Sequence, residues 1–279
     1  EEAHYFQQAG LDVRIKEGSP EKNAINELEL GHADFGVASA DQVIRAVSKG
    51  AKIIVIAQIF QVNPMQWIYR SSLGEIRTPD DLKYKKIGIT FGGNDETIMK
   101  TILARAGIRE DQVFLSGVRF DFTPFLTGKV DVWPVYRNSQ GVILAGRMAD
   151  EGEPVLFFNP ADAGVRFVAN SVITTSALME KQPETVKRFV SALLKAWESA
   201  MAPENEAAVL AAVQKRDSGT QGRVQQKQLI ATRALVKPLP DKRIGNIDMD
   251  AWRETEAIML KEKLIQKPVH IERYLVQIP

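Results

Sequence analysis

The sequence predicts an α/β protein of two lobes, each a parallel-rich sheet with helices on both faces. Strand-like and helix-like segments alternate over the first 175 residues, and such alternation gives mostly parallel sheets with helical crossovers. The alternation restarts near residue 78, which predicts a second array of similar build. After Ala177 the chain turns helical, with apolar stripes at helical spacing.

The composition is that of a globular protein, and the net charge limits the classes of binding partner to expect. The 279 residues are 44% hydrophobic and 25% charged, enough to bury a full core. Lys and Arg number 36 against 35 Asp and Glu, so the net charge of +1 gives no reason to expect nucleic acid or an anionic membrane surface as a partner. The absence of cysteine excludes disulfides, thiolate metal sites and a cysteine nucleophile.

The first array begins with a β-type run at 11–16 and a helix that opens at Ser19-Pro20 and closes at Gly31. Further elements are expected as strands at 33–37, 53–57 and 66–69 and as a helix at 41–48. The segment 53–57 is continuously apolar and mostly β-branched, which is typical of a strand covered on both faces.

The second array begins with a short capped helix at 78–82 and a strand at 86–90. A glycine-containing turn then leads into a helix that runs to about Ala106. Three more strands are predicted, at 113–115, 130–133 and 155–158. Helices complete the chain at 183–201, 204–215, 221–236 and 248–263.

The two arrays share one short pattern. Residues 31–35 and 128–132 both read Gly-x-x-Asp-apolar, each between a helix and a strand. One interpretation is a reused helix-to-strand turn in which glycine supplies a left-handed cap. The other is that the two lobes have a similar overall build.

Several motifs follow one another in a fixed order: residues 5–13, 31–36, 40–43, 60–64, 78–83 and 86–88. Their series runs from about residue 5 to 200 and resembles the periplasmic solute-binding proteins of ABC transporters, in the group for sulfonates, nitrate and thiamine-pyrimidine precursors. The resemblance implies a type II periplasmic-binding-protein fold whose lobes close on a ligand in the cleft between them. It places lobe I at 1–84 plus 170–279 and lobe II at 85–169, with crossings near 71–85 and 158–170.

The family normally has a strand and a helix ahead of Tyr5-Phe6, so the resemblance implies that lobe I lacks its first strand and helix here. Three motifs, Phe60-Gln61, Tyr136-Arg137-Asn138 and Pro160-Ala161-Asp162, resemble the thiamine-pyrimidine precursor branch. The superfamily also includes a pyridoxal-phosphate-using pyrimidine synthase with a cysteine-rich motif. The corresponding stretch, 168–175, contains no cysteine, which argues against that enzyme.

The resemblance therefore implies a non-enzymatic, cofactor-free monomer that hands a small polar or aromatic molecule to a membrane permease. Its location would be the periplasm, or the cell exterior with a lipid anchor. Two alternatives stay open: a ligand-sensing module of a membrane receptor, and the pyridoxal-phosphate-dependent synthase.

Ligands of open α/β sheets sit beyond the carboxyl ends of the strands. That rule first draws attention to residues after each predicted strand and between the lobes, among them Gln58, Arg137 and Phe167. The expected ligand-binding residues are Ser39, Asp41, Gln61, Asn63, Trp67, Gly92, Gly93, Asn94, Asp95, Tyr136, Asn138, Asp162 and Asn170.

Each residue type has a chemical use. Asn and Gln amides match the donor and acceptor edge of a pyrimidine, and Tyr136 or Trp67 could stack on its ring. Gly92 and Gly93 would leave backbone N–H groups exposed to bind an anion or the polar edge of a ring. Alternatively, they form only a turn between a strand and a helix. Asp41 and Asp162 could pair with an amino group, although Asp41 could instead cap a helix.

No catalytic or metal-binding pattern stands out in the sequence. The histidines, His4, His32 and His270, lie far apart and lack metal-ligand spacing. The Gly92-Gly93 turn lacks the Gly-Lys-Ser/Thr of a phosphate loop, and no serine sits in a nucleophile elbow.

Overall fold

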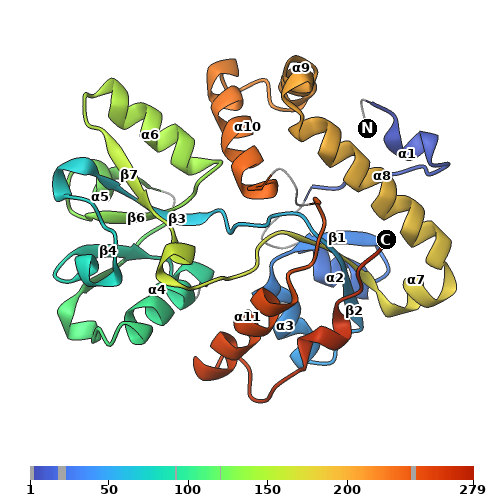
Figure 1. Ribbon diagram of the computed structural model, residues 1–279, viewed down its shortest axis with the longest axis horizontal. Coiled ribbons are helices and arrows are strands. Elements are labelled where there is room, and N and C mark those ends of the chain that lie inside the picture. The colour runs from blue at the N-terminus through green and yellow to red at the C-terminus, as the bar shows by residue number, and fades with distance from the viewer. Residues whose placement is uncertain (1–2, 18–22, 92, 120, 240–242) are drawn as a thin grey trace. The chain divides into compact units, whose positions relative to one another are not determined.

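The computed structural model describes residues 3–17, 23–91, 93–119, 121–239 and 243–279 (Figure 1). The chain forms two compact units. Unit 1 comprises Glu1–Val62, Val168–Leu229 and Arg233–Pro279, and unit 2 comprises Asn63–Phe167 and Ile230–Thr232. The chain thus leaves unit 1 at 62/63, not near 71–85, and returns at 167/168, inside the expected 158–170. The expected lobe boundary at 84/85 is therefore wrong.

The reason for the earlier boundary is strand β3 (Met65–Arg70). This strand pairs with β6 (Val132–Tyr136) and β7 (Val155–Phe158), both in unit 2. The segment 63–84 therefore belongs to unit 2, although the family resemblance places it in lobe I.

Unit 1 contains a three-stranded sheet in the order β1-β8-β2. Strand β8 (Ser171–Thr175) runs antiparallel between β1 (Phe35–Ala38) and β2 (Ile53–Gln58). Every residue of β2 is buried, which confirms the prediction that it is covered on both faces. The prediction of a parallel-rich sheet is wrong here, because β8 separates the two strands that run in the same direction.

Helices cover both faces of this sheet (Figure 1). The apolar stripe of α8, including Val186, Val190 and Leu194, packs in one core cluster with β2 and β8, whereas α11 packs against α3. The helices of this part of the chain are α1 (Tyr5–Gln8), α2 (Ala24–Glu29), α3 (Ala40–Ser48), α7 (Ser176–Lys181), α8 (Pro183–Met201), α9 (Glu206–Arg216), α10 (Gly222–Val236) and α11 (Met249–Lys261).

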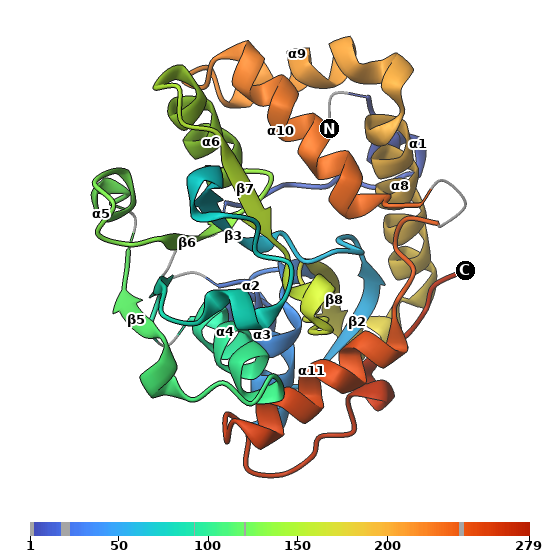
Figure 2. The same ribbon diagram turned by 60° about the vertical axis from the view of Figure 1, so that its left-hand side comes forward.

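Unit 2 contains a five-stranded sheet in the order β5-β4-β6-β3-β7. Strand β4 (Lys86–Ile89) is parallel to β5 (Phe114–Gly117) and to β6, whereas β3 lies antiparallel between β6 and β7. Figures 1 and 2 show α4 (Asn94–Arg105) and α6 (Gln140–Asp150) on opposite faces of this sheet. A short helix, α5 (Thr123–Leu126), adds Phe125 to the core cluster on the α6 side.

The reversed strand in each sheet has the same place in the chain. Strand β3 is the first strand after the chain enters unit 2, and β8 is the first strand after it returns to unit 1. Each inserts antiparallel between strands that run in the same direction. The unit 1 sheet is therefore antiparallel throughout, whereas the unit 2 sheet is mixed.

Most predicted elements are present, with shifted ends. The expected strand at 11–16 is not formed, because a β-type run becomes a strand only where another strand pairs with it, and none of the described residues does so. The expected helix start at Ser19-Pro20 lies outside the described residues, and α2 is capped by Asn23, whose side chain accepts from Asn26 N.

The repeated Gly-x-x-Asp pattern is a repeated turn. Gly31 and Gly128 both have φ of 70°, a left-handed conformation that glycine adopts without steric cost. In both turns the N–H groups of the next two residues donate to the carbonyl four positions before the glycine, that of Glu27 or of Pro124. The interpretation as a reused helix cap is confirmed.

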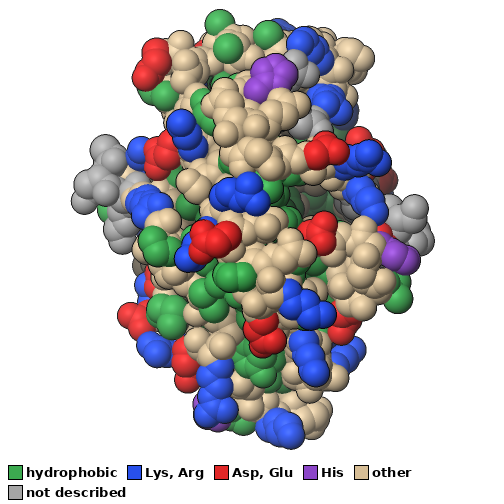
Figure 3. Space-filling model, turned by 90° about the vertical axis from the view of Figure 1, so that its right-hand side faces the viewer, with side chains coloured by type: hydrophobic (Ala, Val, Ile, Leu, Met, Phe, Trp, Pro, Cys, Tyr) green, Lys and Arg blue, Asp and Glu red, His purple; other side chains and the backbone are tan. Residues whose placement is uncertain are grey.

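On the face of unit 1 shown in Figure 3, the basic and acidic side chains of the described residues are interspersed. This agrees with a net charge of +1. Among the residues that the structure describes, no helix is both long enough and apolar enough to cross a bilayer.

Candidate functional site

Seven of the predicted site residues gather at one edge of the unit 2 sheet. Strands β4 and β6 are parallel neighbours, so their carboxyl ends share this edge. Strand β3 starts there, with Met65 opposite Tyr136, and β7 ends there, with Phe158 opposite Trp67. The predicted residues that follow or precede these strand ends are Asn63, Gly93, Asn94, Asp95, Tyr136, Asn138 and Asp162.

The side chain of Asn63 is hydrogen-bonded to backbone groups of unit 2. Its Nδ2 donates to the carbonyl of Phe167 at 2.6 Å, and its Oδ1 accepts from Met65 N at 2.8 Å. Phe167 itself is buried. Asn63 therefore fixes where β3 begins, and the amide offers a ligand little free capacity.

The turn before α4 is also internally satisfied. Gly93 N–H donates to Thr90 O at 2.7 Å, and a Cβ at position 93 would lie 2.5 Å from Asp95 Oδ1. Asp95 is buried, and its Oδ2 accepts from Thr90 N at 2.6 Å. Asp95 thus supports the turn from inside, and Asn94 is left partly exposed at the first position of α4. Gly92 lies outside the described residues.

We expect Asp95→Asn to change how stability depends on pH. Burial raises the pKa of Asp95 despite its hydrogen bonds to Thr90, whereas an unfolded Asp has a pKa near 4. Below that pH both states hold the proton. As the pH rises above about 4, the unfolded chain ionises first, so the wild type loses stability until the raised folded pKa is passed. The advantage of the variant over the wild type should therefore grow with pH.

Urea unfolding at several pH values between about 3 and 7 measures this difference. The control is Asp111→Asn, because hydrogen bonding from Arg109 lowers the pKa of the exposed Asp111. Its stability relative to the wild type should fall over the same pH range. A pH-independent difference for Asp95→Asn would contradict the proposed cost of burying this carboxylate.

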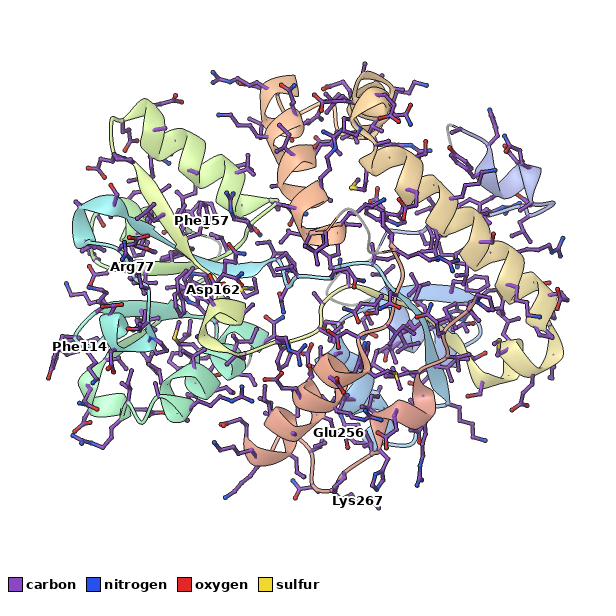
Figure 4. The ribbon with its side chains drawn as sticks, in the orientation of Figure 1. Arg77, Phe114, Phe157, Asp162, Glu256 and Lys267 are labelled. Carbon is purple, nitrogen blue, oxygen red and sulfur yellow. The ribbon has the colours of Figure 1, made fainter. Side chains whose placement is uncertain are left out.

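Tyr136 and Asn138 present polar and aromatic groups at the end of β6. Tyr136 is 38% exposed, and its N–H donates to Gln140 Oε1 at 3.2 Å. Asn138 Nδ2 donates to Thr232 Oγ1 at 3.0 Å, within unit 2. Asp162 is exposed on the short helix η4 (Pro160–Ala163), and Figure 4 labels it.

Trp67 is a core residue, so the prediction that it stacks on a ligand is wrong. Its side chain is fully buried, and Nε1 donates to Gly88 O at 3.1 Å. The cause is the position of β3, which is an inner strand between β6 and β7 and is buried at Trp67.

Arg137, noted at the end of a predicted strand but not chosen as a site residue, has a distinctive environment. The centre of its guanidinium lies 3.9 Å from the centroid of the Phe157 ring. Burial lowers the pKa of Arg137. The sequence gives no sign of this pair, because β6 and β7 are separated by β3 and their proximity depends on strand order.

The unit 1 residues also meet at one sheet edge, where β1 and β2 end and β8 begins. Ser39 Oγ donates to Asp41 Oδ1, and Ser39 N–H donates to Gln42 Oε1 at 3.1 Å in a capping box for α3. Ser39 and Asp41 remain partly exposed, so the helix-cap interpretation of this segment is supported.

Two glutamines at this edge hold loops of unit 1. Gln58 is buried, and its Oε1 accepts from Asp248 N at 3.1 Å and from Trp252 Nε1 at 3.2 Å. Gln61 Nε2 donates to Gln58 O at 2.8 Å and to Asn246 O at 3.0 Å. The carbonyl of the half-buried Asn170 accepts from Ile59 N and Phe60 N. Gln58 therefore has a structural role. Gln61 and Asn170 already use some of their hydrogen-bonding groups within the fold.

A hollow of about 330 Å³ lies elsewhere on unit 1, between α1 and α8. It is lined by Tyr5, Gln8, Ala9, Lys187, Arg188, Ser191, Ala192 and Lys195. None of the predicted site residues lines it, and two of its cations already have partners in Glu184 Oε1 and Ala9 O. The sheet edges are therefore the better candidate sites.

Within the described ranges, no three His, Asp or Glu side chains cluster to hold a metal ion.

The architecture of two α/β units is the fold of periplasmic binding proteins. The alkanesulfonate-binding protein SsuA of Xanthomonas axonopodis pv. citri, solved with MOPS, superposes with a TM-score of 0.69 at 15% identity over 99% of this chain and 92% of its own. The desulfurization enzyme DszB superposes with a TM-score of 0.63 at 15% identity, over 99% of this chain and 91% of its own. The fold is thus confirmed, and it occurs in binding proteins and in an enzyme.

The chain belongs to the NMT1/THI5-like family, whose sequence model matches residues 1–207. A Haemophilus influenzae protein described as a thiamine biosynthesis protein is 25% identical over 209 residues, covering 73% of this chain and 63% of that protein. The riboflavin-binding protein RibY of Chloroflexus aurantiacus is 25% identical over 247 residues, covering 86% of this chain and 68% of RibY. The family resemblance seen in the sequence motifs is confirmed.

Proposed function

We propose that this chain is the periplasmic solute-binding component of an ABC importer and has no catalytic activity. Its ligand is a small molecule with a flat nitrogen heterocycle, with a thiamine-pyrimidine precursor as the first candidate. The chain would need no cofactor, and its macromolecular partner would be the membrane permease. Family membership and the shared fold with sulfonate-binding proteins support the transport role.

The observation that carries the ligand class is the polar and aromatic edge of the unit 2 sheet. Tyr136 is partly exposed there, and Asn94 and Asn138 follow the neighbouring strands β4 and β6. A phenol ring can stack on a heteroaromatic ring, and each amide offers both a donor and an acceptor. A pyrimidine presents the matching pattern of ring nitrogens and substituents.

The comparisons support a heterocycle from two directions. One relative is described by thiamine biosynthesis and the other by riboflavin binding, and both vitamins contain a pyrimidine ring or a fused form of it. Sulfonate binding by the structural neighbours is the competing ligand class.

A ligand screen tests the proposal. Purified protein is melted with 4-amino-5-hydroxymethyl-2-methylpyrimidine, riboflavin and pentane-1-sulfonate in turn, since ligands that bind only the folded state raise Tm. Hits are measured by isothermal titration calorimetry. A rise with the pyrimidine supports both role and ligand, and a rise with pentane-1-sulfonate alone rejects the heterocycle. No rise with any compound rejects the binding role for these ligand classes.

We expect Asn138→Ala to weaken binding of the pyrimidine about 5- to 100-fold, because a ligand group would lose its amide partner in a partly desolvated site. Asn138 also donates to Thr232 Oγ1, so Thr232→Val is the matched control. That variant removes the acceptor but keeps the amide, and its Kd should stay within about threefold of the wild type. Equal losses in the two variants, measured by calorimetry, would assign Asn138 a structural role only.

A further inference from the structure

The Arg137 side chain is held in a defined position in unit 2. Its guanidinium stacks on Phe157, which Figure 4 labels on β7. The ring is itself confined by the start of α6, since a Cβ at Gly141 would lie 3.2 Å from Phe157 Cε1. Glycine at position 141 therefore lets the ring approach the helix, and the ring in turn provides a flat support for the guanidinium.

The guanidinium has no counter-ion within the part of the chain that the structure describes. Among the described residues, no carboxylate and no hydrogen-bond acceptor pairs with its five N–H donors. The side chain is nevertheless partly buried, and this burial lowers the pKa of Arg137. A cation that is partly removed from water without compensation is costly, and an incoming anion would remove that cost.

Arg70, in the same unit, shows how such an arginine is satisfied when its role is structural. It also lies over a phenylalanine ring, that of Phe125, at 4.9 Å. Its Nε donates to Glu153 Oε2 at 2.6 Å, and its two terminal nitrogens donate to the carbonyls of Phe125 and Leu126 at 2.9 Å. Arg137 has the aromatic support but lacks all three acceptors.

The start of α6 adds positive potential next to this pair. Ser139 precedes the helix and makes no side-chain capping bond, so the first N–H groups of α6 are not capped by it. The Phe157 ring lies beside Gly141 in this first turn, where it would be 3.2 Å from an added Cβ, and it also stacks on the guanidinium. The helix dipole and the guanidinium thus both favour an anion at this end of β6.

We propose that Arg137 binds an oxyanion group of the ligand, a sulfonate or a phosphate monoester, beside the heterocycle or chain held at the same sheet edge. This inference rests on the proposed function and deepens it. The planar guanidinium donates two parallel N–H bonds to two oxygens of one oxyanion. The shared chemistry fits a phosphorylated pyrimidine and an alkanesulfonate alike, and the experiment separates them.

The test compares ligand pairs that differ in the anionic group. One pair is 4-amino-5-hydroxymethyl-2-methylpyrimidine and its phosphate monoester, and the other is pentan-1-ol and pentane-1-sulfonate. For the wild type, calorimetry should give a Kd at least about tenfold lower for the anionic member of one pair. The pair that shows this preference identifies the source of the oxyanion.

Arg137→Gln should weaken the anionic member about 10- to 100-fold and leave the neutral member within about twofold. The matched control is Arg147→Gln, which removes the same charge from an exposed arginine of α6 that pairs with Glu151. It should leave both affinities unchanged. Arg137→Lys keeps the positive charge but loses the two parallel N–H donors of the guanidinium. It should therefore retain part of the preference for the anionic member.

Several results would overturn the inference. One is an equal Kd of the wild type for the neutral and anionic members of each pair. Another is a preference for the anionic member that persists in Arg137→Gln. The third is a loss of affinity in Arg137→Gln that is equal for both members. In each of these cases the proposed function stands when the neutral pyrimidine binds the wild type. If no member of either pair binds the wild type, the proposed function fails together with the inference.

Discussion

Glu256→Gln is expected to lower the free energy of unfolding by about 2–4 kcal/mol. Glu256 is 7% exposed on α11 and is labelled in Figure 4. Its Oε1 accepts from Val269 N at 2.6 Å and His270 N at 3.0 Å, and its Oε2 accepts from Ile271 N at 2.7 Å. One carboxylate thus satisfies three successive backbone donors.

The physical reason for the loss is that an amide has only one oxygen. In the glutamine variant the NH₂ group must face at least one of these N–H donors, which leaves buried donors unpaired. The loop at 269–271 leads into the short helix η6 (Ile271–Tyr274), so this segment should loosen from α11 first.

Urea unfolding followed by circular dichroism measures the change. Glu184→Gln on α8 is the control, because this carboxylate is exposed and forms only a surface ion pair with Lys187, so its effect should stay below about 1 kcal/mol. Glu256→Gln with stability within that same margin would show that the three bonds contribute little.

Gly245→Ala is expected to destabilise the protein by about 2–5 kcal/mol, from two independent causes. Gly245 has φ of 87°, where an L side chain is strained. A Cβ there would also lie 2.5 and 2.7 Å from the two Cδ atoms of Leu194. Leu194 is buried in the core cluster of unit 1, so it cannot move aside without disturbing its neighbours.

Gly146→Ala provides a control with the opposite sign. Gly146 lies inside α6, and a Cβ there would have no atom within 4 Å, so alanine should stabilise by about 0.5–1 kcal/mol through helix propensity. Urea denaturation midpoints of the two variants report both effects. A Gly245→Ala protein as stable as the wild type would mean that the backbone and Leu194 adjust freely.

The sequence predicted best those elements whose signal is local. The continuous apolar run of β2 and the stripe of α8, predicted and found at 183–201, are examples. Helix α6 was missed because Gly141 and Gly146 lower its helix propensity. Strand β8 was missed because its place, between β1 and β2, depends on pairing with segments far away in the sequence.

The site was predicted only in part for a related reason. The rule of carboxyl strand ends selects residues that lie together at one sheet edge within each unit. It does not show which of their side chains are already bound within the fold. Asn63 and Asp95 are bound to backbone groups, and Trp67 is buried. The stacking of Arg137 on Phe157 needs the order of the strands, which local patterns do not contain.

The placement of β8 has a consequence for synthesis on the ribosome. Among the described residues, β1 and β2 form their strand ladders only with β8, so both emerge long before their shared partner. Strands β3 to β7 come from one continuous stretch, Asn63–Phe167, and can pair while the rest is still being made. The sheet of unit 2 can therefore assemble first, and the apolar β2 stays without its neighbour until translation passes Thr175. During that interval a nascent chain exposes a strand that a chaperone would recognise.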